Sequence, residues 1–129
     1  MRGRLAAVLG ELRRIPDIVA VAIARRDGLL IAHALPKSSN PKKIAAMSAS
    51  IVGTAEMATA EMGQGILNQV LVDTSGGKIL ATGAGPEAIL VAMVRSEANI
   101  GLILLNIERA ARTIGSLLEA DGATAEAVP

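Results

Sequence analysis

Short apolar runs joined by turns of hairpin length constrain the fold of this 129-residue chain more than any other feature. The first two runs, 18–24 and 29–34, flank Arg25-Arg26-Asp27-Gly28, and an Asp-Gly pair between apolar runs is the strongest local hairpin signal. Three further runs follow at 66–73, 78–83 and 88–94. Because their connections are also of hairpin length, we expect a largely antiparallel sheet.

Two helices are predicted before and between these runs. Apolar residues recur at helical spacing from Leu5 to Leu12, and this segment ends before Pro16 because the residue preceding a proline avoids the helical conformation. A second, central helix begins after Asn40, an N-cap residue followed by proline, and runs to Met62.

A last helix is predicted to begin after Ser96 or Asn99 and to end near residue 118. Residues 119–129 lack periodicity, and we expect them to form a disordered tail. The element order is therefore α-β-β-α-β-β-β-α. We predict a single α+β domain over residues 1–118, in which helices cover an antiparallel sheet.

Composition excludes several classes of function. The chain has no cysteine, which excludes disulfides, zinc–thiolate sites and a cysteine nucleophile. It has one histidine, His33, and no Phe, Tyr or Trp, so a two-imidazole site and base stacking on aromatic side chains are both excluded. With 13 Lys and Arg against 12 Asp and Glu, it is not a polybasic nucleic-acid binder.

The catalytic and cofactor motifs in the sequence are incomplete. Residues 83–88 match the loose glycine pattern of dinucleotide sites, but a β-like run follows where the fingerprint needs a helix. Gly76-Gly77-Lys78 lacks the glycine spacing and the hydroxyl residue of a phosphate-binding loop. Glu56 and Glu61 are five residues apart and do not share a helix face. We therefore predict a protein that is not an enzyme and has no catalytic residues, cofactor or metal.

No segment is predicted to enter a membrane. The apolar run at the N-terminus stops at Gly10-Glu11, too early for a signal peptide. The most apolar stretch, 88–105, is interrupted by Arg95, Glu97 and Asn99. We expect a cytoplasmic protein.

The central helix carries too few charges for a helix with a solvated side, because only Glu56 and Glu61 are charged within 44–62. The face expected to lie on the sheet consists of Ile44, Met47, Ser48, Ile51, Ala55, Ala58 and Met62. The opposite face consists of Ala46, Ala49, Gly53, Met57 and Ala60. A mid-helix glycine costs about 1 kcal/mol relative to alanine, which favours close packing of another chain here. The alternative is an alanine-rich surface helix.

Charge is divided unevenly along the chain. Residues 1–43 carry nine basic and three acidic residues, whereas residues 44–129 carry four and nine. The basic pairs Arg25-Arg26 and Lys42-Lys43 either attract an acidic partner or, more commonly, keep a turn and a helix start solvated. Lysine at a helix N-terminus opposes the helix dipole, which favours a partner role for Lys42 and Lys43.

Taken in order, these segments resemble the Roadblock family over residues 1–118. The resemblance rests on the hairpin 25–32, the Ala- and Met-rich helix 44–62, the segments 65–72 and 77–80, and residues 98–102 before the last helix. It implies a five-stranded antiparallel sheet with two helices on one face and one on the other, similar to longin and profilin folds.

The resemblance also implies how the chain assembles. Family members pair two subunits through the central helix and the third strand, here 44–62 and 66–73, into a ten-stranded sheet. The paired helices dock small Ras-like GTPases. Members act as GTPase regulators in prokaryotes and as scaffold or dynein light-chain subunits in eukaryotes. This short chain resembles the prokaryotic regulators, and no arginine finger is carried over to it.

We therefore predict a homodimer that binds a small Ras-like GTPase through its paired central helices and modulates the GTPase cycle. The predicted dimer-interface residues are Ala46, Ala49, Gly53, Met57, Ala60, Leu67, Gln69 and Leu71. The predicted partner-binding residues are Lys42, Lys43, Ser50, Met57 and Glu61. The main alternative is a structural dimeric scaffold without effect on nucleotide turnover. A third reading, a small-ligand sensor, needs a pocket.

Overall fold

The computed structural model describes the backbone of residues 2–127 and the side chains of residues 2–120. Its elements follow the predicted order. They are α1 (Arg2–Arg13), β1 (Ile18–Arg25), β2 (Leu30–Ala34), α2 (Pro41–Glu61), β3 (Gln69–Thr74), β4 (Gly77–Ala84), β5 (Ala88–Val94) and α3 (Ile100–Ala127).

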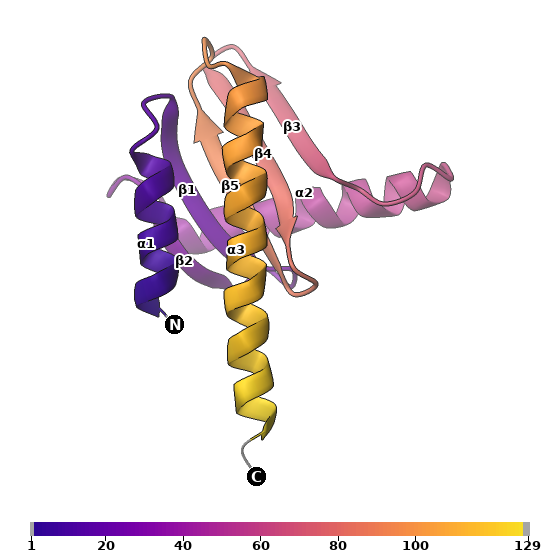
Figure 1. Cartoon of the computed structure of the whole chain (residues 1–129). Coiled ribbons are helices and arrows are strands. Elements are labelled where there is room, and N and C mark those ends of the chain that lie inside the picture. Colours follow the sequence, from indigo (N-terminus) through magenta and orange to yellow (C-terminus); the bar gives the residue numbers. More distant parts are fainter. Residues whose placement is uncertain (1, 128–129) are drawn as a thin grey trace.

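The five strands form one sheet in the order β2-β1-β5-β4-β3, and all neighbours pair antiparallel. The three predicted hairpins are β1–β2, β3–β4 and β4–β5, while α2 separates β2 from β3 along the chain. Because α2 connects the two sets of hairpins, β1 and β5 pair in the middle of the sheet, and β2 and β3 lie at its two edges. Helices α1 and α3 lie on one face and α2 crosses the other (Figure 1). The predicted fold class is confirmed.

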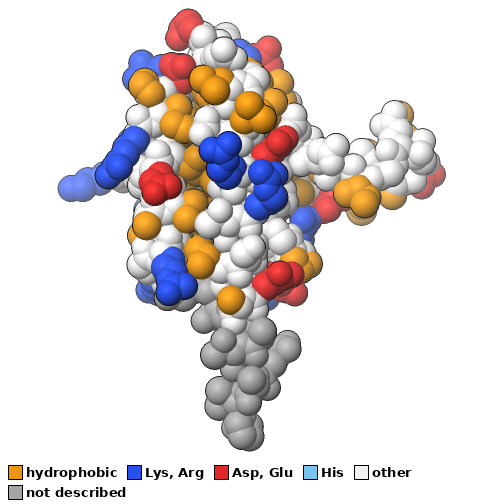
Figure 2. All heavy atoms as spheres, viewed as in Figure 1, with side chains coloured by type: hydrophobic (Ala, Val, Ile, Leu, Met, Phe, Trp, Pro, Cys, Tyr) orange, Lys and Arg blue, Asp and Glu red, His pale blue; other side chains and the backbone are white. Residues whose placement is uncertain are grey.

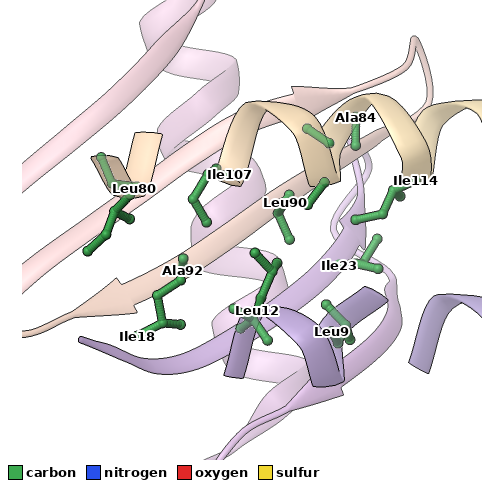
Figure 3. Packing of buried hydrophobic residues seen from close by; sticks show 14 of the residues in the cluster. Leu9, Leu12, Ile18, Ile23, Leu80, Ala84, Leu90, Ala92, Ile107 and Ile114 are labelled. Carbon is green, nitrogen blue, oxygen red and sulfur yellow. The ribbon is translucent and has the colours of Figure 1, made fainter. Parts of the chain in front are cut away.

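The larger hydrophobic core lies between the sheet and the layer formed by α1 and α3. Leu9 and Leu12 of α1 and Ile107 and Ile114 of α3 point toward sheet residues such as Leu90 (Figure 3). All five side chains are buried. Because a fully buried Leu or Ile contributes about 1.5–3 kcal/mol, this layer supplies most of the hydrophobic stabilisation of the fold.

A smaller core lies under α2 on the other face of the sheet. Its buried residues are Ala24, Ala45, Val52, Ala81, Ile89 and Val91. Half of them are alanine, which buries little surface, so α2 is held to the sheet less strongly than α1 and α3.

Strand β3 begins at Gln69, three residues later than predicted. The reason lies in Thr82, the β4 residue opposite Gln69. Its hydroxyl Oγ1 donates a hydrogen bond to the Asn68 carbonyl at 2.9 Å, so a side chain takes the place of the backbone ladder and the chain leaves the sheet. The expectation that 66–68 belong to the strand was wrong.

Helix α3 begins as predicted and ends later than predicted. The Asn99 side chain accepts a hydrogen bond from the Leu102 N–H at 3.2 Å, which identifies Asn99 rather than Ser96 as the cap. The helix then runs past 118 to Ala127. Of the segment expected to be a disordered tail, residues 119–127 are therefore helical, while residues 128–129 and the side chains after Ala120 lie outside the described part. Among the described helices, none is long and apolar enough to cross a membrane.

Candidate protein-interaction surface

Helix α2 begins where the sequence placed it. The Asn40 side chain accepts a hydrogen bond from the Lys43 N–H at 3.2 Å, and Pro41 occupies the first turn. Lys42 and Lys43 follow, both exposed. The helix therefore presents two cationic side chains at one end of the sheet face that it crosses.

The face of α2 that rests on the sheet differs from the predicted one. The buried residues are Ala45, Ser48 and Val52, whereas Met47 and Ile51 of the predicted face are exposed. The strand residues beneath the helix include Ala24 and Ala81, so small residues let the helix lie close to the sheet. Of the predicted face, Ser48 is buried and Ile44 and Ala55 are half-buried, while Met47, Ile51, Ala58 and Met62 are exposed.

The end of α2 and the start of the following loop, residues 57–66, extend past the sheet (Figure 1). We call this segment the α2 arm. Its large apolar side chains are exposed: Met57 by 68%, Met62 by 70% and Ile66 by 91%. In the space-filling view, the arm stands clear of the body, with hydrophobic side chains on its surface (Figure 2). An arm of this kind gains little stability from its own chain, because few of its atoms leave water.

Edge strand β3 lies next to the arm. It pairs with β4 along its whole length, from Gln69 opposite Thr82 to Thr74 opposite Gly77, and no strand of the described part of the chain pairs with its other side. Leu71, in the middle of the strand, is 47% exposed. An edge strand presents unpaired backbone N–H and C=O groups that another chain can complete.

The sheet face beside α2 is also incompletely covered. Ile79 and Met93 pair across β4 and β5, and with Val19 they line a hollow of about 340 Å³. Val19 and Met93 are each more than a third exposed. The apolar side of α2, the arm, the free edge of β3 and this hollow together make an apolar surface that a single chain leaves open.

An ion pair holds the C-terminal third of α2. The Arg26 Nη1 donates to both carboxylate oxygens of Glu56 at 2.9 Å, and Nη2 donates to the Gly85 carbonyl at 3.4 Å. Arg26 thus links the β1–β2 turn, the β4–β5 turn and α2. Its Nε is buried without a hydrogen-bond partner, and both charged groups are partly solvated. Sequence reasoning missed this contact because its partners are thirty residues apart.

The predicted interface residues do not all lie on the open surface. Ala46, Met57, Ala60 and Leu71 are exposed, and Gly53 and Gln69 are half-buried. Ala49 and Leu67 pack against the smaller core of their own chain. The predicted partner-binding residues Lys42, Lys43, Ser50, Met57 and Glu61 are all exposed. The prediction did not include four exposed residues of the open surface, Met47, Ile51, Met62 and Ile66. The near absence of charge on the helix could have indicated them, because it implies exposed apolar residues on more than one side.

The remaining motif candidates occupy turns and edges. Gly85, in the loose dinucleotide pattern, has φ of 78° in the β4–β5 turn, and β5 follows directly. His33 is exposed, and its Nδ1 accepts a hydrogen bond from the Leu35 N–H at 3.3 Å. Within the described residues, no group of three His, Cys, Asp or Glu side chains could hold a metal ion. A wide hollow of about 860 Å³ lies between the 64–69 loop, the end of β4 and α3.

Known proteins share the sequence pattern of this chain. The model of the Roadblock/LC7 domain matches residues 5–93. A protein from Methanocaldococcus jannaschii, MJ1340, is 37% identical over 110 residues, which are 85% of this chain and 96% of that protein.

Solved structures agree with the fold at low sequence identity. The gliding protein MglB from Thermus thermophilus superposes with a TM-score of 0.84 and 20% identity, covering 92% of this chain and 91% of that chain. A Roadblock/LC7 domain from Streptomyces avermitilis gives a TM-score of 0.82 at 17% identity, covering 88% of this chain and 96% of that chain.

Proposed function

The chain belongs to the Roadblock/LC7 domain family, and from this premise we propose that it is a homodimeric regulator of a small Ras-like GTPase. Two copies pair through α2 and β3, and the paired helices form the platform on which the GTPase docks. The protein supplies no catalytic residue of its own to the hydrolysis of GTP.

The α2 arm is the observation that carries this proposal. Met62 and Ile66 are among the most exposed large apolar side chains in the described part of the chain, and they lie in the segment that leads into edge strand β3. A second copy related by a two-fold axis places its own arm against the open sheet face beside α2. That contact covers the hollow at Val19, Ile79 and Met93 while the two β3 edges complete each other's hydrogen bonds.

The partner surface is what this pairing leaves accessible on the two α2 helices. Lys42, Lys43 and Glu61 supply charge for steering, and Ser50 and Met57 supply contact. The chain has no aromatic residue to anchor a partner, so the adaptable Met57 side chain takes that role.

Dimer formation through α2 is tested by placing glutamates on the outer face of the helix, at positions where a single chain can accept the larger side chain. A Cβ added at Gly53 meets no atom within 4 Å, and Ala60 is exposed, so Gly53→Glu with Ala60→Glu leaves the protomer folded. We expect this double variant to sediment at the protomer mass while the wild type sediments at twice that mass.

The matched control is Ala6→Glu with Ala7→Glu, which adds the same charge at exposed positions of α1. It should keep the dimer mass and the circular dichroism spectrum of the wild type. A dimer that persists in the α2 variant contradicts the α2 interface.

GTPase regulation is tested by capture followed by a rate measurement. We expect immobilised protein to retain a small GTPase from the source organism's lysate in the presence of a non-hydrolysable GTP analogue more strongly than with GDP. The purified GTPase should then hydrolyse GTP at a different rate when the wild-type protein is added. With the Gly53→Glu, Ala60→Glu variant, the rate should equal that of the GTPase alone. Recovery of assembly components without nucleotide dependence, together with an unchanged rate, favours the scaffold alternative.

A further inference from the structure

The opposite edge of the sheet, strand β2, is not used by the proposed dimer. Within residues 2–127, Leu30 to Ala34 pair only with β1, and their outer side meets no strand. In the described structure, α1 contacts β2 from one face of the sheet and α2 contacts it from the other (Figure 1). Pairing two copies through β3 leaves this edge open at both ends of the joined sheet.

Strand β2 lacks charged residues and proline, two of the usual protections of an edge strand. Proteins blunt such edges with charged residues, proline or bulges directed outward. The five residues of β2 include no proline and no Lys, Arg, Asp or Glu. The strand is short, and its register with β1 skips Ile31 at a bulge, so pairing on the outer side is available to a short segment. Ile31, Ala32 and Ala34 pack against the larger core and Leu30 against the smaller one, so side chains on both faces of the sheet hold the strand in place.

The surroundings of β2 are positive. No Asp or Glu occurs between Gly28 and Ala55, a stretch that includes Lys37, Lys42 and Lys43. Arg13 reaches the end of the strand from α1, where its Nη1 donates to the Ala34 carbonyl at 2.9 Å. The nearest preceding carboxylate, Asp27, is already paired with Arg25 at 2.9 Å.

We propose that β2 binds an extended acidic segment of a partner protein, which adds to the sheet as a sixth strand. Main-chain hydrogen bonds supply the affinity of such an added strand, and its alternating side chains supply the specificity. The positive charges favour carboxylates on the incoming segment. They disfavour a second copy of β2, because that pairing would bring Lys37, Lys42 and Lys43 of both chains together.

A peptide of alternating Glu and Val with one terminal Trp is a direct probe. The protein has no Trp, Tyr or Phe, so the fluorescence of the peptide is measured without background. We expect saturable binding that weakens by about tenfold or more between 50 and 500 mM NaCl, because the attraction between exposed charges is screened by salt. Amide shifts in the NMR spectrum should centre on residues 30–34.

Two control peptides separate charge from backbone pairing. The same peptide with Lys in place of Glu should not bind. A version that is N-methylated throughout keeps the carboxylates but has no backbone donors, and it should lose at least tenfold in affinity. Equal binding of the methylated peptide overturns strand addition.

Protein variants locate the site. Adding negative charge in the strand with His33→Glu and reversing the charge beside it with Lys37→Glu should together weaken binding at least tenfold. Reversing two charges on α3, with Arg109→Glu and Arg112→Glu, should have little effect. Equal losses in both variants overturn the assignment to β2. Growth of the wild type into larger assemblies without peptide, abolished by His33→Glu with Lys37→Glu, identifies a second copy as the occupant instead. The dimer variant at Gly53 and Ala60 should bind the peptide normally.

Discussion

Gly115 shows how a single missing side chain sets the distance between α3 and the sheet. A Cβ at this position would lie 2.9 Å from the Gly85 nitrogen and 3.2 Å from the Ala84 carbonyl carbon. Both are backbone atoms, at the end of β4 and the start of the β4–β5 turn. They cannot move aside as the end of a flexible side chain could. The glycine therefore lets the helix pack directly on the turn.

Replacing Gly115 with alanine should lower the free energy of unfolding by about 1–2 kcal/mol. Overpacking costs about 1–3 kcal/mol, and the better helix propensity of alanine returns only part of it. Urea denaturation followed by circular dichroism measures the change. Gly10→Ala on α1 is the matched control, because nothing lies within 4 Å of its added Cβ, and it should gain about 0.5–1 kcal/mol. Equal gains at both positions would contradict the close packing.

The Arg26–Glu56 contact shows what residue-level reasoning could not supply. A carboxylate on a nearly uncharged helix is visible in the sequence, and so is an arginine in a turn. Their meeting depends on where α2 crosses the sheet, which no local pattern specifies. The hairpin at Asp27-Gly28 and the cap at Asn40 were predictable because their physics is contained within four residues.

At the scale of elements, order and pairing were predictable and the rotation of α2 was not. Turn residues and periodicity correctly gave the type and order of three helices and five strands, because those signals are local, whereas the start of β3 and the end of α3 were misplaced. The prediction for α2 assumed that the largest apolar residues face the sheet. The structure buries Ala45, Ser48 and Val52 instead, since small residues on both sides allow close approach. The same assumption led to Ala49 being placed in the interface and Ile51 in the core.

The α2 arm should become protected when two copies pair. In the Gly53→Glu, Ala60→Glu protomer, we expect amide hydrogens of residues 57–61 to exchange at least tenfold faster than in the wild type, because the arm then has few contacts to keep it closed. Exchange in α3 over residues 103–114 should be similar in both proteins. Hydrogen–deuterium exchange with mass spectrometry measures both segments, and equal protection of the arm in both would argue against its burial in the dimer.

At the scale of the whole molecule, the chain divides its apolar residues between an internal core and an open surface. The larger core on the α1 and α3 face is closed within one chain, whereas the α2 face leaves Met47, Ile51 and Met62 in water. In the proposed dimer, much of the stability of the α2 face depends on a second chain. Pairing of this kind therefore makes stability a function of protein concentration.

The melting temperature of the wild type should rise with concentration. For a dimer that dissociates on unfolding, each tenfold increase in concentration favours the folded state by about 1.4 kcal/mol per dimer, which corresponds to a few degrees for a chain of this size. Scanning calorimetry over two decades of concentration measures the shift. The Gly53→Glu, Ala60→Glu variant should melt at one temperature throughout, and a wild type that does the same would indicate that it unfolds as a single chain.

The separation of the two sheet faces has a consequence for the history of such proteins. Substitutions on the outer side of α2 leave the packing among α1, α3 and the sheet untouched, so selection on recognition and selection on folding act on different residues. After a gene duplication, substitutions on α2 can change the binding partner of one copy while the packing of its core stays the same. A lineage can in this way accumulate several versions of one small fold that do not mix with each other.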